Sequence, residues 1–359
     1  MDKITQSVET VIQLDKISDT ERLDLVQEVL NNELDLTNPK LVKILKEYLT
    51  SKQLPTENMK TQNLKESEQD GEISCLCMFN GQLVSGGADG SIKIWNTETM
   101  KPSTIIPGST PITCLAVIRD QLFIGTKGSV IIRDKDLNVV QQLPLLNNDK
   151  SDVTCFLDTT NLAGGFIHTG CSSGIIYSIY MSRKETVYRI AGGTYNAKSY
   201  IRNMIYYQDK VYVCTKNSIQ KANSFLSWPG NDFADNRETK RDWTQIRFIE
   251  DELYAFDSEG DIFLLNYTTL TIGKNCIEAS KCTSLFPSYV CEYIDSRLFI
   301  GTSEGKFWFI KNPITNDPSR GDIHTLCKSG LKSIAQDRNE LYIRCTKGHI
   351  HGYTIKNGN

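Results

Sequence analysis

Residues 83–96 read LVSGGADGSIKIWN, and the fold can be predicted from this stretch. It starts with the apolar pattern of a strand, passes through a glycine-rich turn that holds Asp89, and continues as a second strand that reaches Trp95. A short connection between antiparallel strands needs a positive φ angle, which glycine and asparagine tolerate. The stretch therefore predicts a β-hairpin with a tight turn that ends at Gly90.

The same arrangement recurs seven times along the chain. Each repeat starts with an apolar, polar, small and apolar residue, and a strand, a turn and a second strand follow. The starts lie at 73–76, 112–115, 153–156, 201–204, 243–246, 282–285 and 331–334, and the turns end at Gly90, Gly128, Gly174, Asn217, Gly260, Gly305 and Gly348. Both series advance by roughly 40 to 50 residues, the period of a four-stranded propeller blade. Residues 72–359 are therefore predicted to form an all-β, seven-bladed β-propeller.

The first repeat resembles the WD40 family, through its glycine-rich turn with Asp89 and through Trp95. The resemblance implies a non-catalytic propeller that binds protein or peptide partners across the face where its turns emerge. The other six repeats have no tryptophan aligned with Trp95, and the family's Gly-His pair is absent ahead of the inner strands. We therefore expect the blades to depend on apolar packing more than on the family's buried Ser/Thr-His-Asp-Trp network.

Residues 1–55 differ from the repeats, because their apolar residues recur at helical spacing. Ser18 with Glu21 makes a capping box, and Asn38 before Pro39 fits a helix start. We expect a short α-helical extension, either a hairpin or three helices, that self-associates, binds a helical partner or packs on the propeller. Residues 56–71 are predicted to be a linker, in which segment 60–67 supplies the outer strand that the last repeat lacks.

Composition limits the cellular setting and the partners. The formal net charge of −3 predicts no general attraction to polyanions, so any basic surface must be local. The eleven cysteines are scattered through the repeats, which indicates reduced thiols and a cytoplasmic or nuclear protein. With no signal-peptide pattern and no apolar run near 18 residues, we expect no membrane insertion.

We predict no catalytic, cofactor or metal site. Phosphate-binding loops, nucleophile elbows and metalloprotease helices are absent from the sequence. Cys75, Cys114 and Cys155 occupy one slot in three repeats, which favours packing over a zinc site because free cysteine behaves as a small apolar residue. By the same reasoning Cys214 and Cys345 are placed where other repeats have glycine. His349 and His351 alternate along a strand and are interpreted as ordinary strand residues.

Basic residues gather where the turns and the connections into the inner strands are predicted to emerge. The candidate partner-binding residues are Lys127, Arg202, Lys216, Arg241, Trp243, Lys281, Lys306, Lys332 and Lys347. Asp89, Asp257, Glu259 and Glu304 are expected to divide this face electrostatically. The alternative is that surface turns simply favour solvated lysine, and that Trp243 packs in the core.

Two connections are long for a blade, and their role is open at this point. Residues 223–241 contain aromatic side chains, so they either contact a partner or fold back as a covering strand. Residues 312–323 are similar but more polar.

The function we expect is a non-catalytic WD40-type scaffold or adaptor. It would bind protein or peptide partners, acidic or phosphorylated ones included, and join a larger complex through residues 1–55. One alternative is an RNA-associated propeller in an RNA-processing or ribosome-assembly complex, although RNA is the less favoured partner. The other is a substrate receptor of a ubiquitin ligase.

Overall fold

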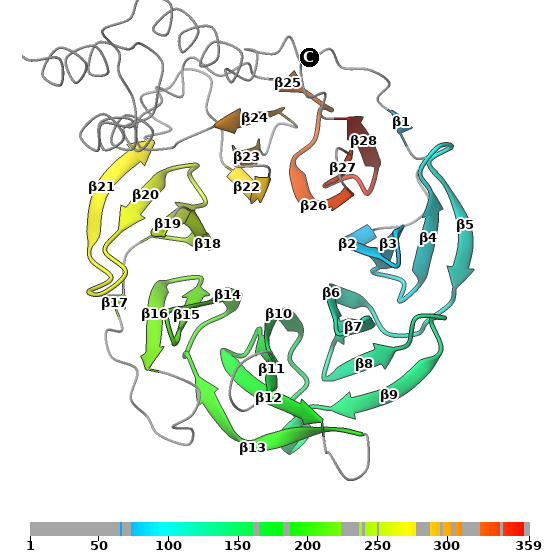
Figure 1. Cartoon of the computed structure of the whole chain (residues 1–359), viewed down its shortest axis with the longest axis horizontal. Helices are drawn as coiled ribbons and strands as arrows, with labels where there is room; N and C mark the ends of the chain where they lie inside the picture. Colours follow the sequence, from blue (N-terminus) through cyan, green and yellow to red (C-terminus); the bar gives the residue numbers. More distant parts are fainter. Residues whose placement is uncertain are drawn as a thin grey trace, which may run out of the picture. The chain divides into compact units, whose positions relative to one another are not determined.

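The structure is a computed structural model that forms seven four-stranded antiparallel sheets in its described part (Figure 1). It describes residues 65–66, 73–160, 165–181, 187–223, 237–238, 241–249, 251–277, 288–294, 297–302, 306–310, 324–337 and 340–354. All of them belong to one compact unit, Gln62–Thr354. The expected α-helical extension of residues 1–55 lies outside the described residues.

Blades 1 to 3 each come from one continuous stretch of chain. Blade 1 holds β2 (Ile73–Phe79), β3 (Gln82–Gly87), β4 (Ile92–Asn96) and β5 (Lys101–Ile106). Blade 2 holds β6 (Ile112–Ile118), β7 (Gln121–Thr126), β8 (Ser129–Arg133) and β9 (Val139–Pro144), followed by the short 3₁₀ helix η1 (Leu146–Asn148). Blade 3 holds β10 (Val153–Thr159), β11 (Phe166–Cys171), β12 (Ile175–Met181) and β13 (Tyr188–Asn196).

Blades 4 to 7 follow the same order, with one exception in the last. Blade 4 holds β14 (Ile201–Tyr207), β15 (Lys210–Thr215), β16 (Ser218–Asn223) and β17 (Arg237–Glu238). Blade 5 holds β18 (Trp243–Ile249), β19 (Glu252–Asp257), β20 (Ile262–Leu265) and β21 (Ile272–Ile277). Blade 6 holds β22 (Ser288–Ile294), β23 (Arg297–Thr302), β24 (Lys306–Ile310) and β25 (His324–Thr325). Blade 7 holds β26 (Leu331–Asp337), β27 (Glu340–Cys345), β28 (Ile350–Thr354) and β1 (Lys65–Glu66).

The first strands of the blades form the inner wall of a closed ring. Each of β2, β6, β10, β14, β18, β22 and β26 contacts the next, and β26 contacts β2 again (Figure 1). The expectation of an all-β propeller is thus confirmed. Among the described residues, no helix has the length and apolar character needed to cross a bilayer.

Blade 7 takes its outer strand from the N-terminal side of the chain. Lys65 of β1 pairs with Gly352, and Glu66 pairs with His351, both antiparallel. This strand lies inside segment 60–67, the segment that the sequence suggests as donor. The pairing covers the outer edge of β28, which would otherwise present unpaired backbone groups.

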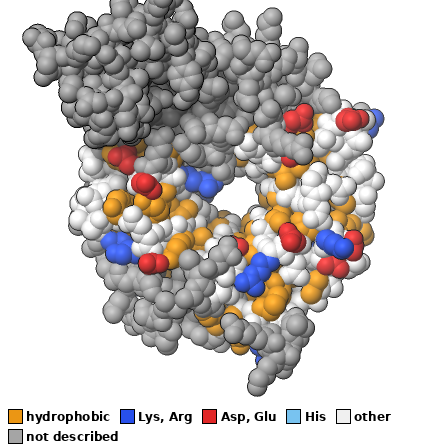
Figure 2. Space-filling model, in the orientation of Figure 1, with side chains coloured by type: hydrophobic (Ala, Val, Ile, Leu, Met, Phe, Trp, Pro, Cys, Tyr) orange, Lys and Arg blue, Asp and Glu red, His pale blue; other side chains and the backbone are white. Residues whose placement is uncertain are grey.

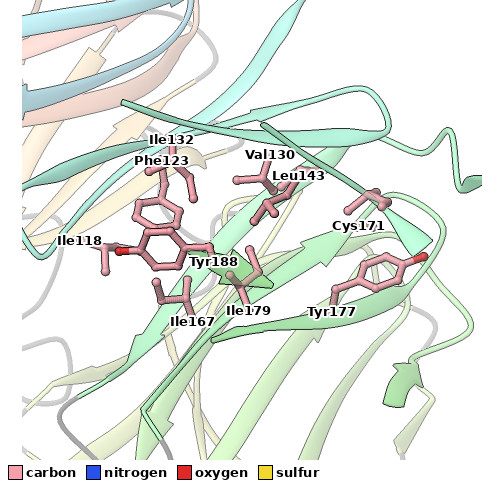
Figure 3. Close-up of a cluster of buried hydrophobic side chains, with 12 residues drawn as sticks. Ile118, Phe123, Val130, Ile132, Leu143, Ile167, Cys171, Tyr177, Ile179 and Tyr188 are labelled. Carbon is pink, nitrogen blue, oxygen red and sulfur yellow. The ribbon is translucent and has the colours of Figure 1, made fainter. Parts of the chain in front are cut away.

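Apolar packing between blades accounts for the burial pattern along the second strands. In β7, for example, the last five residues are all buried, since a neighbouring blade covers each face of the sheet. Figure 3 shows the layer between blades 2 and 3, where Phe123 from β7 meets Tyr188 from β13 edge to face, with ring centroids 5.4 Å apart.

Two details differ from the sequence prediction. The sixth inner strand begins at Ser288 rather than at 282, directly after Pro287, which cannot donate a hydrogen bond to a ladder. Asn217 does not adopt a positive φ, unlike Gly128 (73°) and Gly174 (86°). Its turn is instead closed by a side chain, because the Ser218 amide donates to Thr215 Oγ1 at 3.0 Å.

The buried polar network is present only in pieces. In blade 1 the Trp95 indole donates to Ser85 Oγ at 2.9 Å. In blade 3 a buried histidine, His168, lies 2.9 Å from Ser178 Oγ and 3.2 Å from Thr159 Oγ1. These bonds hold individual blades together.

The two long connections both lead into outer strands. β17 pairs with β16 and β25 pairs with β24. A returning strand therefore follows each connection, while residues 224–236 and 311–323 lie outside the described residues.

Candidate partner-binding face

One end of the ring carries the turns between second and third strands together with the connections into the inner strands. Strand direction alternates within a blade, so these segments meet at the same end. Backbone hydrogen bonds link them: Gly128 N to Ser151 O at 2.8 Å, Lys216 N to Tyr200 O at 2.9 Å, and Thr346 N to Gly330 O at 2.6 Å. We refer to this end as the turn face.

The second residue of each inner strand lies at a register shift where the strand begins at the turn face. These seven equivalent positions hold Ser74, Thr113, Thr154, Arg202, Thr244, Tyr289 and Lys332. The three threonine hydroxyls donate to carbonyl oxygens of their own blades, at distances of 2.9 to 3.0 Å. Two of these seven positions are therefore positively charged, Arg202 in blade 4 and Lys332 in blade 7.

Arg202, Lys332 and Arg344 form a cluster that we refer to as the mouth cations. Arg344 Nη1 donates to Ser74 O, across the joint between blades 7 and 1, at 3.0 Å. Desolvation lowers the pKa of Lys332, and the positive charges of Arg344 and Arg202 lower it further. Arg202 and Lys332 lie at the starts of two inner strands, so positive charge gathers on the part of the ring that faces the central opening. Figure 2 shows one face of the ring with this opening.

One carboxylate balances part of this charge. Arg202 Nη2 lies 3.2 Å from Asp242 Oδ1, and its guanidinium lies over the Tyr200 ring, 5.2 Å from the centroid. Both partners of this ion pair are about a third exposed, at 35% and 38%. The pair remains accessible, so a second anion can share the arginine.

Arg241 has a structural role that the sequence did not reveal. Its Nη1 lies 2.7 Å from Asp257 and 3.4 Å from Asp261, and its guanidinium packs 4.3 Å from the centroid of Phe263. Burial raises the pKa of Asp257, while the Asp261 backbone and Arg241 act in the opposite direction. Although carboxylate oxygens of Asp257, Glu259 and Asp261 lie within 4.8 Å of one another, Arg241 already supplies their cation.

The prediction that Trp243 anchors a partner is wrong. The side chain is only 1% exposed and belongs to a core cluster, where it packs edge to face on Phe263 at 5.6 Å. Burying its large apolar surface between blades is more favourable than exposing it to solvent.

The lysines of the turns fall into three groups. Lys127, Lys216 and Lys347 are exposed, as turn residues are expected to be. Lys306 is half-buried at the start of β24. Lys281 lies outside the described residues.

The expected acidic division of the face is reduced by burial. Asp257 is 2% exposed, so it contributes little to the surface. Asp89 accepts bonds from the Ser91 amide and hydroxyl, which lower its pKa and tie it to its own turn. Glu304 lies outside the described residues.

The cysteine slot packs against glycine. A side chain added at Gly125 would meet Cys114 Sγ at 2.4 Å, and one at Gly170 would meet Cys155 Sγ at 2.8 Å. Burial raises the pKa of Cys155 to about 12, so the thiol stays protonated.

Cys214 does occupy the glycine slot, but the placement of Cys345 there was wrong. The register pairs Cys114 with Gly125 and Asn203 with Cys214, while in blade 7 it pairs Ser333 with Arg344. Arg344 is therefore the residue that replaces glycine, and the sequence analysis missed it. Aligning the second strands residue by residue would have found it, since a buried arginine there has no equivalent in the other blades.

Comparisons with known proteins identify a fold and nothing finer. No family model matches the chain, and no curated protein matches it. Solved structures do. The computationally designed Ika8 protein has a TM-score of 0.57 at 14% identity, over 79% of this chain and 84% of that one. BamB from Moraxella catarrhalis has a TM-score of 0.54 at 12% identity, over 84% and 96%. A chain in a crystal structure of the mitotic checkpoint complex has a TM-score of 0.63 at 11% identity, over 83% and 92%.

By structure, the chain resembles WD40-type propellers. Identities this low carry the fold alone, so the chemistry of the turn face must come from the residues described above.

Proposed function

We propose that this chain is a non-catalytic WD40-type scaffold that binds an acidic segment of a protein partner at the centre of the turn face. The mouth cations carry the proposal. Three positive side chains influence one another at this end of the ring: Lys332 is exposed, Arg202 is partly exposed, and Arg344 is buried beside them. Asp242 is the carboxylate paired with Arg202. A carboxylate-rich or phosphorylated segment is the chemistry that such a cluster recognises.

The rigidity of the turn face supports binding of this kind. Its turns are hydrogen bonded to the connections beside them, so little conformational freedom is lost on binding. The exposed lysines Lys127, Lys216 and Lys347 extend the positive charge outward, where they would accelerate encounter with an acidic partner.

The remaining parts of the proposal concern the assembly and its location. Residues 1–55 would join the propeller to a larger complex, as their helical pattern suggests. Fold likeness to a chain of the mitotic checkpoint complex, a protein assembly by its name, is in keeping with such a role. None of the eight described cysteines forms a disulfide, which fits a cytoplasmic or nuclear scaffold.

Lysine-directed cross-linking tests which face a partner occupies. The tagged chain is purified from the cells that express it after cross-linking, and the linked lysines are mapped by mass spectrometry. We expect partner cross-links at Lys127, Lys216 and Lys347. The control lysines lie at the opposite end of the ring: Lys101 and Lys210 begin β5 and β15, and Lys135 lies between β8 and β9. Cross-links mainly at these controls would contradict the proposal.

Charge neutralisation tests the cluster itself. The double variant Arg202→Gln/Lys332→Gln should lose most of the captured partner, and the matched variant Lys101→Gln/Lys135→Gln should retain it. Equal capture by both variants would refute an acidic partner. Capture that disappears after ribonuclease treatment would favour RNA instead and would overturn the proposal.

A further inference from the structure

Two strands and one connection of blade 7 bring together three metal-binding side chains. Cys345 ends β27, His351 is the second residue of β28, and Cys327 lies in the connection from β25 to β26. Their ligand atoms, two sulfurs and one imidazole nitrogen, all lie within 4.8 Å of one another.

The register explains why the first two side chains meet. His351 pairs with Ile343, and Cys345 lies two residues beyond Ile343 on the same strand. Because side chains alternate along a strand, Cys345 and His351 share one face of the sheet. The connection before β26 then brings Cys327 to the same place. The other described three-residue group, around Asp257, consists of carboxylates instead.

Equivalent positions in the other blades hold different chemistry. Where blade 7 has Cys345, blades 2 and 4 have Thr126 and Thr215, whose hydroxyls donate to turn carbonyls at 2.9 Å. Where blade 7 has His351, blades 2, 3, 4 and 5 have Ile131, Tyr177, Gln220 and Phe263. Blade 3 has a cysteine, Cys171, at the first position but a tyrosine at the second. Among blades 2, 3, 4, 5 and 7, both substitutions occur together only in blade 7.

The side chains are placed as ligands would be. His351 is 2% exposed, and its Nε2 is buried with no hydrogen-bond partner among the described residues. A buried imidazole nitrogen without a partner costs free energy unless something binds it. Cys345 is 1% exposed, and Cys327 Sγ lies 3.0 Å from Ser329 O.

We propose that Cys327, Cys345 and His351 bind a zinc ion at the turn face of blade 7. Thiolate sulfur and imidazole nitrogen suit zinc, whereas calcium and magnesium require oxygen ligands. Tetrahedral bonds of about 2.3 Å to sulfur place ligand atoms about 3.8 Å apart, so small side-chain rotations suffice. Three protein ligands leave the fourth position to water or a ligand from outside, and binding releases the thiol protons to solvent.

The site would reinforce the joint of the ring. His351 also pairs through its backbone with Glu66 of β1. A zinc ion would therefore link β28, the strand that pairs with β1, to the connection that contains Cys327.

Cobalt titration of the reduced, chelator-treated full chain tests the site. We expect one equivalent of Co²⁺ to give the visible bands of tetrahedral coordination and a thiolate charge-transfer band, and Zn²⁺ to displace it. Cys327→Ser, Cys345→Ser and His351→Gln should each weaken affinity by more than the roughly 10- to 100-fold that changes outside the ligand shell cause. Cys171→Ser removes the equivalent cysteine of blade 3 and should bind as the unchanged chain does.

Folding is followed in parallel, since Cys345 and His351 are buried. Cys327 is only half-buried, so Cys327→Ser is expected to keep its circular dichroism spectrum. Zinc should raise the melting temperature of the unchanged chain and of Cys171→Ser, but not that of Cys327→Ser. Absence of stoichiometric cobalt binding, or unchanged bands in Cys327→Ser, would refute the site. A Cys327–Cys345 disulfide that persists when zinc is present would also refute it.

Discussion

Blade 3 and blade 7 have the same four-stranded design but are assembled in different ways. Blade 3 comes from a single run of chain, β10 to β13, whereas blade 7 combines β26, β27 and β28 with β1. Arg344 illustrates the separation, since it bonds Ser74 over 270 residues of sequence. The entropy of closing so long a loop grows only logarithmically with its length, so a short strand pair can hold the joint.

The two blades also fill the same positions with different chemistry. Gly170, Cys171 and Tyr177 of blade 3 correspond to Arg344, Cys345 and His351 of blade 7. Gly170 faces the aliphatic side chain of Ile201 in the next blade, while Arg344 reaches a backbone oxygen. The two blades thus share one backbone geometry. At these positions their side chains are apolar in blade 3, where neighbouring blades pack, and polar in blade 7, next to the joint with blade 1.

Removing the donor strand should have the largest effect on this comparison. Deleting residues 60–67 leaves the outer edge of β28 unpaired, while blade 3 stays complete. We expect the free energy of unfolding to fall by about 2 to 3 kcal/mol, because the two residue pairs of β1 with β28 lose backbone hydrogen bonds of about 1 kcal/mol each and the edge of β28 is left without a partner strand. Urea unfolding measures the loss, and light scattering after size-exclusion chromatography should detect self-association through the exposed edge.

A deletion of equal length that spares β1 is the control. Removing residues 52–59 should leave the unfolding midpoint within error of the full chain. If both deletions behave alike, the pairing of β1 with β28 does not stabilise the ring.

Substitution by valine should affect stability differently at the equivalent positions Gly170 in blade 3 and Arg344 in blade 7. Gly170→Val places Cβ 2.7 Å from Ile201 Cγ2 and 2.8 Å from Cys155 Sγ, so we expect a loss of about 2 to 3 kcal/mol from overpacking. Arg344→Val removes the hydrogen bond to Ser74 O at a site that already holds a large side chain, and we expect a loss of about 1 kcal/mol from that bond. Urea unfolding of both variants gives the comparison, and equal losses would show that the slots are equivalent.

Acid should act most directly on blade 3. Burial lowers the pKa of His168 to about 3, below its ordinary value of 6.5. The unfolded chain therefore binds the proton first, and stability present above pH 6.5 is lost as the pH falls toward 3. At pH 5 this histidine should account for about 2 kcal/mol of lost unfolding free energy. Unfolding at pH 7 and pH 5 measures it, and a His168→Gln chain with an unchanged pH dependence would exclude His168 as the cause.

Much of the fold could be predicted because it is periodic. Six of the seven inner strands begin where the apolar pattern places them, for example at Ile112 and Leu331. The sixth was misplaced because the apolar residues before Pro287 imitate a strand start, whereas the ladder begins only after the proline. The start of an inner strand can therefore be predicted from the local sequence, except where a proline, which has no amide hydrogen, lies beside it.

The turn face was predicted less well, because its chemistry depends on neighbours distant in sequence. Exposure of Lys127 and Lys216 follows from their turns alone. The ion pair of Arg241 with Asp257 and the reach of Arg344 to Ser74 require strands to be brought together first. The sequence likewise offered no reason to single out Cys327 or to group it with His351, since nothing in their spacing shows that a connection and a strand meet.

The pairing of Glu66 with His351 has a consequence for synthesis of the chain. Residue 66 leaves the ribosome before any inner strand does, and its partner follows only after all seven inner strands have been made. The intervening blades can pack on one another in the order of translation, but β1 cannot pair with β28 until the last blade has been made. Completion of the circle is therefore a single late event that requires both β1 and β28, and a nascent chain halted before residue 351 cannot reach the native state.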